Sequence, residues 1–297
     1  MPLLGAPVLA IVLGLGLSLV RRPGTPALPG LAFASSVLLQ VAIVCLGTTL
    51  ALGKVLHVGA RSLPVMLGTL AVALAGAAVL GRLLAVSPRL RTLVGVGTGI
   101  CGASAIAAVA RIVGATEAEI AYAISTIFVF NVVAVLLFPP LGRLLHLSQH
   151  GFGLWAGTAV NDTSSVVAAA YAFGHAAGAQ AVVVKLTRTT LIVPIVLGLS
   201  ALRQRGAGRP RRLVPWFIVG FVLASLADTV GLIGSGPHRV LTDAALALIT
   251  VALAAVGLGS DVGAMRRAGV RPLVLGALLW LAVASVSLAL QWATGQL

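Results

Sequence analysis

Two short motifs place glycine, hydroxyl and amide residues in the middle of long apolar stretches. One reads Gly97-Thr98-Gly99-Ile100-Cys101-Gly102-Ala103-Ser104, and the other reads Gly157-Thr158-Ala159-Val160-Asn161-Asp162-Thr163-Ser164-Ser165. Such residues weaken a helix, and the freed backbone groups need partners from protein, water or a ligand because lipid offers none. Paired interruptions are typical of a small-molecule or ion site near the membrane midplane, built from half-helices whose ends carry partial charges. We predict that residues 97–104 and 157–165 are non-helical or sharply kinked and approach each other.

Only a few ionisable side chains lie deep in the apolar stretches. Asp162 lies near the middle of one stretch, and Lys185 and Arg188 lie on one helical face of the next. A charge at bilayer depth costs about 2.5 to 3.5 kcal/mol on insertion scales, so these groups are expected to face protein or a water-filled cavity. Two cations against one carboxylate favour an anionic ligand. If the anion binds Arg188, Arg188→Ala is expected to abolish binding and leave the protein folded.

Other interpretations of these residues remain open. Lys185 could extend to the outer interface, Arg188 and Asp162 could form a structural ion pair, and the glycines could serve only close helix packing. Asn131 lies at similar depth and could join helices or bind a ligand. The candidate substrate-binding residues are Gly97, Thr98, Gly99, Cys101, Gly102, Ser104, Asn131, Gly157, Thr158, Asn161, Asp162, Thr163, Ser164, Ser165, Lys185 and Arg188.

The elements that carry these residues are predicted to be membrane helices. Hydrophobic residues make up 59% of the chain, charged residues make up 9%, and the mean hydropathy is +1.12, as in a polytopic all-α membrane protein. Most of the segments have about 20 residues, enough to cross a bilayer. We expect one transmembrane domain over residues 1–297, with halves at 1–148 and 149–297. Ten apolar segments are predicted at 3–20, 31–53, 63–86, 92–113, 118–142, 152–174, 179–202, 213–233, 240–260 and 272–295.

The distribution of Lys and Arg predicts the orientation. Loops after odd-numbered segments hold fourteen of these residues, whereas loops after even-numbered segments hold four. Because cytoplasmic loops are enriched in Lys and Arg, both termini are predicted to face outward and the loop from Arg203 to Arg212 to face the cytoplasm. The net charge of +14 therefore reports orientation and not a nucleic-acid partner. The expected location is the bacterial plasma (inner) membrane.

Two internal echoes suggest a repeat. Residues 97–108 resemble 157–168, and residues 41–62 align without gaps with 251–272. In the ten-span topology the second pair runs in opposite directions, as an inverted repeat requires, whereas the first pair runs in the same direction. We therefore predict two inverted five-helix halves with broken helices at the midplane, and the first echo stays unexplained by that symmetry.

Cysteine and histidine usage predicts neither a disulfide framework nor a metal site. Cys45 and Cys101 both fall within apolar segments. His146 and His150 have the spacing of a metal-binding pair, but no third ligand is near them in the sequence. No cofactor is expected.

The two motifs and the segment Val184-Lys185-Leu186-Thr187-Arg188 resemble the YeiH family of bacterial membrane proteins, which is associated with sulfate export. The resemblance runs through nearly the whole chain. It implies a secondary transporter with inverted five-helix repeats, distantly related to the sodium/proton antiporter and bile-acid symporter superfamily. Many members carry histidine at the position of Asn161.

These observations favour a secondary transporter that exports a small anion, such as sulfate or an organosulfonate, coupled to H⁺ or Na⁺. The alternatives are a cation/proton antiporter that uses Asp162 and a passive anion channel. An enzyme is not expected, because Ser104 has no base at its depth. The expected partners are the anion, the coupling ion and the lipid bilayer; the sequence leaves a homodimer open.

Overall fold

The computed structural model describes residues 6–20, 24–203, 215–233, 237–259 and 270–297, and the regular elements in these ranges are all helices. Residues 204–212 of the loop predicted to be cytoplasmic and residues 260–269 of the second echo lie outside these ranges. The helices are α1 (Ala6–Val20), η1 (Thr25–Ala27), α2 (Leu28–Phe33), η2 (Ala34–Leu38), α3 (Leu39–Gly47), α4 (Leu52–Leu83), α5 (Pro88–Gly99), α6 (Ala103–Val113), α7 (Glu117–Leu144), α8 (Gln149–Ala159), α9 (Thr163–Phe173), α10 (His175–Thr190), α11 (Ile192–Arg203), α12 (Trp216–Thr229), α13 (His238–Leu258) and α15 (Val270–Ala293).

Six helical stretches in the described part of the chain are long and apolar enough to cross a membrane. They are Leu28–Gly47, Leu52–Leu83, Glu117–Leu144, His175–Leu199, His238–Leu258 and Val270–Ala293. A helix suits such a segment because it satisfies its backbone hydrogen bonds internally. The predicted all-α membrane class is confirmed, whereas the count of ten spans is not.

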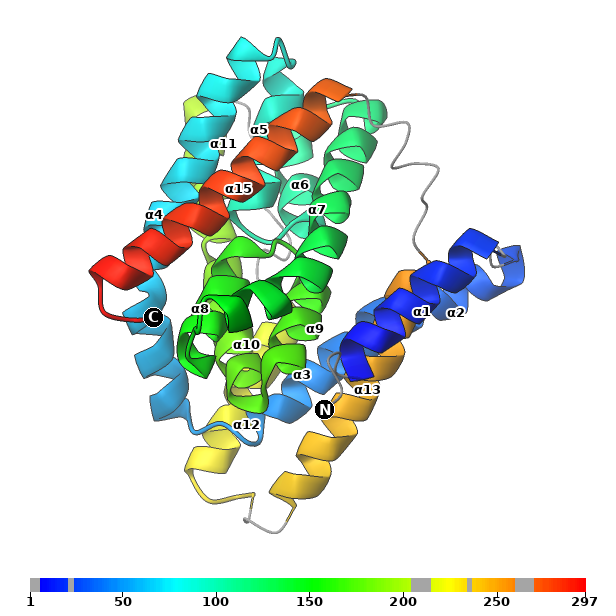
Figure 1. The fold of residues 1–297 in the computed structure, drawn as a ribbon, viewed down its shortest axis with the longest axis vertical. Helices are drawn as coiled ribbons and strands as arrows, with labels where there is room; N and C mark the ends of the chain where they lie inside the picture. Colours follow the sequence, from blue (N-terminus) through cyan, green and yellow to red (C-terminus); the bar gives the residue numbers. More distant parts are fainter. Residues whose placement is uncertain (1–5, 21–23, 204–214, 234–236, 260–269) are drawn as a thin grey trace.

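Helices α5 and α6 form a helical hairpin, which we call the first hairpin. Ser87 caps the start of α5, and its hydroxyl donates to Glu119 Oε1 at 2.7 Å, in the first turn of α7. Helix α6 ends at Val113, three residues before Thr116, the N-cap of α7. The start of α5 and the end of α6 therefore lie at the same end of the molecule, in the upper part of Figure 1.

Helices α8 and α9 form a second hairpin. The Gln149 side-chain oxygen at the start of α8 accepts hydrogen bonds from the N–H groups of Ala176 and Ala177, at 3.0 and 3.2 Å, in the first turn of α10. Arg143, near the end of α7, donates to the Ala172 carbonyl near the end of α9 at 3.0 Å. The start of α8 and the end of α9 therefore share one end of the molecule.

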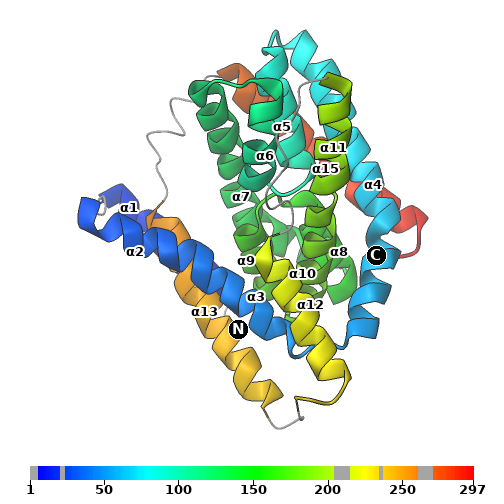
Figure 2. The ribbon, with the colours of Figure 1, turned by 180° about the vertical axis from the view of Figure 1, so that it is seen from behind.

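The two hairpins enter from opposite ends. Helix α7 has 28 residues, which gives it a length of about 42 Å, and it runs from the open end of the first hairpin to that of the second. Figures 1 and 2 show the two hairpins end to end beside α7. Segments 92–113 and 152–174 therefore fold as hairpins, and the prediction that each crosses the membrane is not confirmed. The sequence could not distinguish the two folds, because a hairpin and a broken span both consist of an apolar segment, a polar break and a second apolar segment.

This arrangement also corrects the interpretation of the first echo. The first hairpin and α7 cover residues 88–144, and the second hairpin with α10 and α11 covers residues 149–203, about 60 positions later. Because the hairpins open at opposite ends, the matching segments run in opposite directions. The echo between 97–108 and 157–168 is therefore compatible with inversion.

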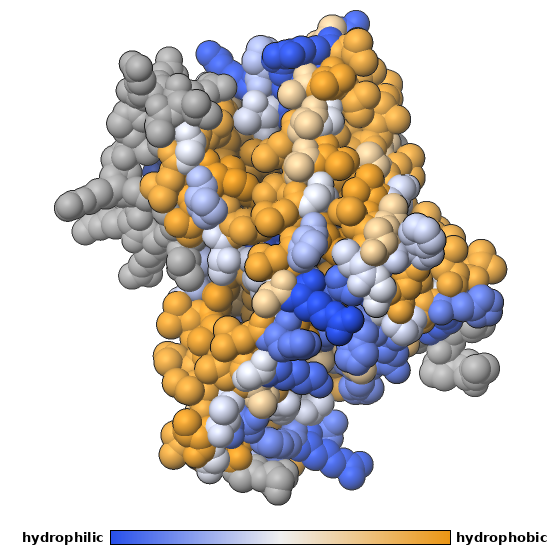
Figure 3. Space-filling view, turned by 90° about the vertical axis from the view of Figure 1, so that its left-hand side faces the viewer, coloured by the Kyte–Doolittle hydropathy of each residue, from blue (hydrophilic) through white to orange (hydrophobic). Residues whose placement is uncertain are grey.

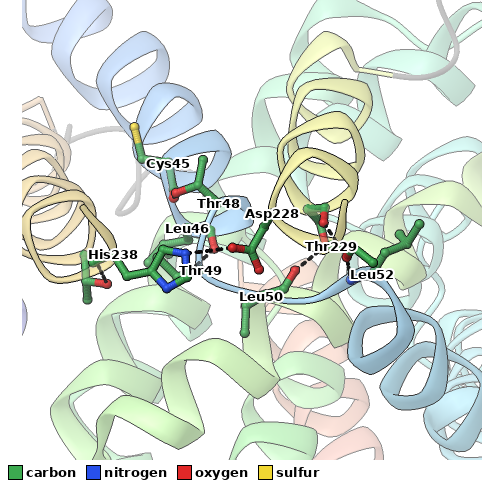
Figure 4. A network of polar contacts seen from close by, with 11 residues as sticks. Cys45, Leu46, Thr48, Thr49, Leu50, Leu52, Asp228, Thr229 and His238 are labelled. Atoms are coloured by element: carbon green, nitrogen blue, oxygen red, sulfur yellow. Dashed lines mark hydrogen bonds and ion pairs between the residues drawn. The ribbon is translucent and has the colours of Figure 1, made fainter. Parts of the chain in front are cut away.

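The remaining helices flank the hairpins. Helices α4 and α15 pack across the first hairpin, and α1, α2, α3, α12 and α13 form a neighbouring group (Figure 1). Figure 4 shows the junction where α3 meets α4. There the Leu52 N–H donates to Thr229 Oγ1 at 2.7 Å, the Ser225 hydroxyl donates to the Leu50 carbonyl, and His238 pairs with Asp228 at 2.7 Å. These bonds fix α12 and α13 against the junction.

The surface is largely apolar. Large hydrophobic side chains are exposed along α4 and α12, among them Leu56, Leu67 and Leu223. Figure 3 shows one such face, where a group of hydrophilic residues interrupts the hydrophobic surface in the lower half. An apolar surface of this extent suits contact with lipid.

Candidate functional site

The tips of the two hairpins meet in the interior. The first tip is Ile100, Cys101 and Gly102, and the second is Val160, Asn161 and Asp162. A Cβ atom at Gly102 would lie 3.7 Å from the carbonyl carbon of Asn161. Gly102 has φ +69°, a left-handed conformation that favours glycine and that reverses the chain. The predicted breaks and their approach are confirmed, but they are narrower than predicted, because residues 97–99, 103–104, 157–159 and 163–165 are helical.

Lys185 joins the two tips. Its ammonium group donates to the carbonyl oxygens of Ile100 and Val160, each at 2.9 Å. The side chain comes from α10 and is fully buried. The alternative in which Lys185 extends to the interface is therefore wrong.

Arg188, one turn later on α10, binds backbone carbonyls at the C-terminal ends of α5 and α8, the first helix of each hairpin. Its Nε donates to the Gly99 carbonyl at 2.7 Å, and its terminal nitrogens donate to the carbonyls of Thr98, at 3.4 Å, and Thr158. Arg188 is also fully buried. The last carbonyls of a helix have no partner within the helix and form its negative end, so cations are favourable there. The two cations are compensated by backbone carbonyls of α5, α8 and the two tips.

This geometry corrects two expectations about Arg188. The described residues contain no ion pair between Arg188 and Asp162, so the structural-pair alternative is wrong. Because Arg188 holds carbonyls that would otherwise be unsatisfied, the expected result of Arg188→Ala changes from lost binding to lost folding stability.

The backbone N–H groups of the second tip also have partners. Asp162 caps α9: its Oδ2 accepts from the N–H groups of Ser164 and Ser165, at 2.9 and 3.3 Å, and from the Ser164 hydroxyl. The Asn131 side-chain oxygen from α7 accepts from the N–H groups of Asn161 and Asp162, at 3.0 and 3.3 Å. Asn131 is buried and here supports the tip.

The first tip is different because no side chain caps α6. Within the described chain, the N–H groups of residues 103–105 have no hydrogen-bond partner. Ala103 and Ser104 are exposed, and the Ser104 hydroxyl donates to the Cys101 carbonyl at 3.2 Å. Two buried polar atoms in the adjoining segments, Thr98 Oγ1 and Asn161 Oδ1, also have no partner. The positive end of α6 is therefore open to a ligand.

The remaining candidate residues are three glycines with packing roles, two threonines and a cysteine. A Cβ atom at Gly97, Gly99 or Gly157 would come within 2.9 Å of Ile106, Leu70 or Val184, respectively, so the packing interpretation holds for these glycines. The Thr158 hydroxyl lies 2.7 Å from the Ser287 hydroxyl of α15. Cys101 is a buried free thiol, and Thr163 begins α9 half-buried.

Sequence reasoning missed several groups at the tips. Ile100 and Val160 contribute carbonyls, and Ala103 contributes an N–H group, so their side-chain types carry no signal. Ser287 and Gln291 are different: they are polar, four residues apart in the last apolar segment, and Gln291 Nε2 donates to Ser287 Oγ at 3.1 Å. That spacing could have identified them.

The apolar helices, the lipid-compatible surface and the two opposed hairpins define a multi-pass helical membrane protein. The family described as "Conserved hypothetical protein 698" matches residues 1–276. The chain belongs to this family, whose curated members are named UPF0324 membrane proteins, and this confirms the resemblance to YeiH.

The similar proteins match almost the whole chain. A UPF0324 membrane protein from Clostridium tetani is 39% identical over 313 residues, which cover 99% of this chain and 91% of the relative. One from Streptococcus pyogenes is 43% identical over 310 residues, and one from Streptococcus pneumoniae is 43% identical over 307 residues, with the same coverage. No solved structure matches the chain.

Proposed function

We propose that this protein is a secondary transporter of a small anion, bound at the tip of the first hairpin. The observation that carries the proposal is the uncapped start of α6, where N–H groups of residues 103–105 have no partner. Unpaired N–H groups and the positive helix end together form an anion site. The Ser104 hydroxyl lies at the same place and adds a donor that can rotate.

The charges around the tips support an anion over a cation. Lys185 and Arg188 neutralise the negative ends of α5 and α8, and Asp162 occupies the positive end of α9. The positive end of α6 is then the one helix end at the tips without a charged partner among the described residues. Asp162 is already engaged as a cap, which gives the cation/proton antiporter less support. An oxyanion such as sulfate or an organosulfonate has several acceptor oxygens to match the donors.

The opposed hairpins support transport by alternating access. Inverted units that meet at a midplane site are the arrangement in which either side can open in turn. If segments 92–113 and 152–174 are hairpins and not spans, Arg111 moves to the cytoplasmic side and Arg143 moves to the external side. The cytoplasmic loops then still hold fourteen Lys and Arg residues and the external loops four. The chain is then one transport domain of the bacterial plasma membrane with both termini outside. The direction we propose is export, coupled to H⁺ or Na⁺.

The test is anion flux by the purified full chain in proteoliposomes. A panel of labelled sulfate, sulfonates and chloride would be measured under imposed H⁺ and Na⁺ gradients, with protein-free vesicles as the control. We expect saturable flux of an oxyanion that responds to one of the gradients. Flux that follows only the anion gradient would indicate a passive channel, and no flux of any anion above the control would overturn the proposal.

A further inference from the structure

A second feature of the molecule is a polar cavity between α4, α8 and α10. Its volume is about 310 Å³. Polar side chains from all three helices face it, and residues 295–297 complete its wall. The hydrophilic residues in the lower half of Figure 3 lie on the side of the molecule that carries α4. The polar lining consists of Lys54, His57 and Arg61 of α4, Ser148 and His150 at the start of α8, and Gln180 of α10.

The side chains that line the cavity carry a net positive charge, from Lys54 and Arg61. Lys54, His57 and Arg61 are exposed and follow one another at intervals of three and four residues, so they share one face of α4. None of the described lining residues is Asp or Glu. Cations that line a cleft with low-dielectric walls concentrate their field there and raise the local concentration of anions. The lining therefore selects for negative charge.

Helix α4, which forms one wall of the cavity, packs beside the segment of α10 that carries Lys185 and Arg188. A Cβ atom at Gly59 would lie 3.1 Å from the Thr187 hydroxyl, and Thr187 lies between Lys185 and Arg188 on α10. Arg61 comes two residues later on α4, so it lies close to the depth of the tips. Leu154 lines the cavity and packs in a buried apolar cluster with Val65, Met66 and Val184. Val184 of this cluster directly precedes Lys185 in α10, so the apolar cluster connects the cavity wall at Leu154 to the helix that holds the tips.

We propose that this cavity binds a small oxyanion from solution and is the vestibule of the hairpin-tip site on the external face. The vestibule role rests on the proposed function, whereas oxyanion binding in the cavity does not. The volume is at the lower end of small-molecule sites, roughly 300 to 1,000 Å³, and exceeds what a monatomic ion needs. The planar fork of Arg61 and the Lys54 ammonium supply the charge-assisted donors that a tetrahedral oxyanion accepts.

Binding is tested with labelled sulfate and the purified full chain in phosphatidylcholine nanodiscs. The variants are Lys54→Gln, Arg61→Gln and their combination, and the matched control is Arg239→Gln, which removes an exposed cation outside the cavity. Ala103→Pro removes one N–H group of the hairpin-tip site, so it identifies which of the bound sulfates belongs to that site. We expect two sulfates per chain in the wild type, one of which weakens about tenfold or more in each cavity variant and is unaffected in the control.

The outcomes separate this proposal from the proposed function. Loss of the cavity-dependent sulfate in the double variant supports the cavity site even if the wild type transports no anion. If transport occurs, its KM is expected to rise in the cavity variants with kcat unchanged. Unchanged sulfate binding in the double variant would overturn the cavity site and leave the function standing. If only nanodiscs with phosphatidylglycerol show an Arg61-dependent ligand, the cavity holds a lipid phosphate and the free-anion proposal is wrong.

Discussion

The two hairpin tips have the same backbone plan and different N-terminal caps. In both, the first arm ends on carbonyls that Lys185 and Arg188 hold from α10. In the second tip, Asp162 caps the following helix and Asn131 supports the turn. In the first tip, the following helix starts at Ala103 with no side-chain cap.

The two tips therefore differ in which backbone groups the protein leaves without a partner. The protein satisfies the carbonyls that end α5 and α8 and the N–H groups of the second tip, whereas the described residues offer no partner to the N–H groups that begin α6. A side-chain cap on α6 would occupy the N–H groups that the proposed function gives to the anion. On the proposed function, the second tip supports the fold and the first tip binds the anion.

The strongest test of the shared plan is Arg188→Ala. It leaves the carbonyls of Thr98, Gly99 and Thr158 without their donor in a buried place, and we expect a loss of about 3 to 5 kcal/mol in unfolding free energy. Thermal unfolding in detergent should show a melting temperature lower by about 10 °C or more. A variant that melts like the wild type and loses only anion binding would show that Arg188 contacts the anion instead.

Asn131→Leu tests the support of the second tip. The change removes the acceptor of two buried N–H groups while keeping a side chain of similar size, so we expect a loss of about 1 to 3 kcal/mol. Thermal unfolding measures the loss, and sulfate affinity at the first tip should change less than twofold. A large loss of affinity with normal stability would place Asn131 in the binding site.

A proline pair tests the difference between the tips directly. Ala103→Pro and Thr163→Pro each remove one N–H group at the first position of a helix, where proline is tolerated. We expect Ala103→Pro to weaken sulfate binding about tenfold or more, because it removes a donor to a charged ligand. Thr163→Pro should change binding less than twofold. Equal effects at the two tips would contradict the asymmetry.

The smallest expected effect comes from Asp162→Asn. Asparagine caps a helix about as well as aspartate, so stability should change by less than about 0.5 kcal/mol. Removing the negative charge beside the tips should tighten sulfate binding by about twofold to fivefold. Equilibrium binding at low salt measures the change. Complete loss of transport-substrate binding would instead favour the cation antiporter.

The positions of the polar breaks and of the deep cations could be predicted from the sequence. Glycine, hydroxyl and charged residues are conspicuous in apolar segments, so the breaks near Gly102 and Asp162 and the importance of Lys185 and Arg188 follow from residue type. The partners of the cations could not be predicted, because backbone carbonyls of Ile100, Val160 and Gly99 leave no trace in side-chain chemistry.

The sequence by itself determined the membrane class, the apolar segments, the places where two of them break and the family. Those properties depend on composition and local spacing, which can be read directly from the sequence. The tertiary structure decided that the broken segments return as hairpins, because the direction of the second arm depends on contacts between distant residues. Ser87 with Glu119 and Gln149 with Ala176 close the two open ends across about thirty residues of chain. Only the folded packing brings those residues together, and with them the two tips, where α9 has a side-chain cap and α6 has none.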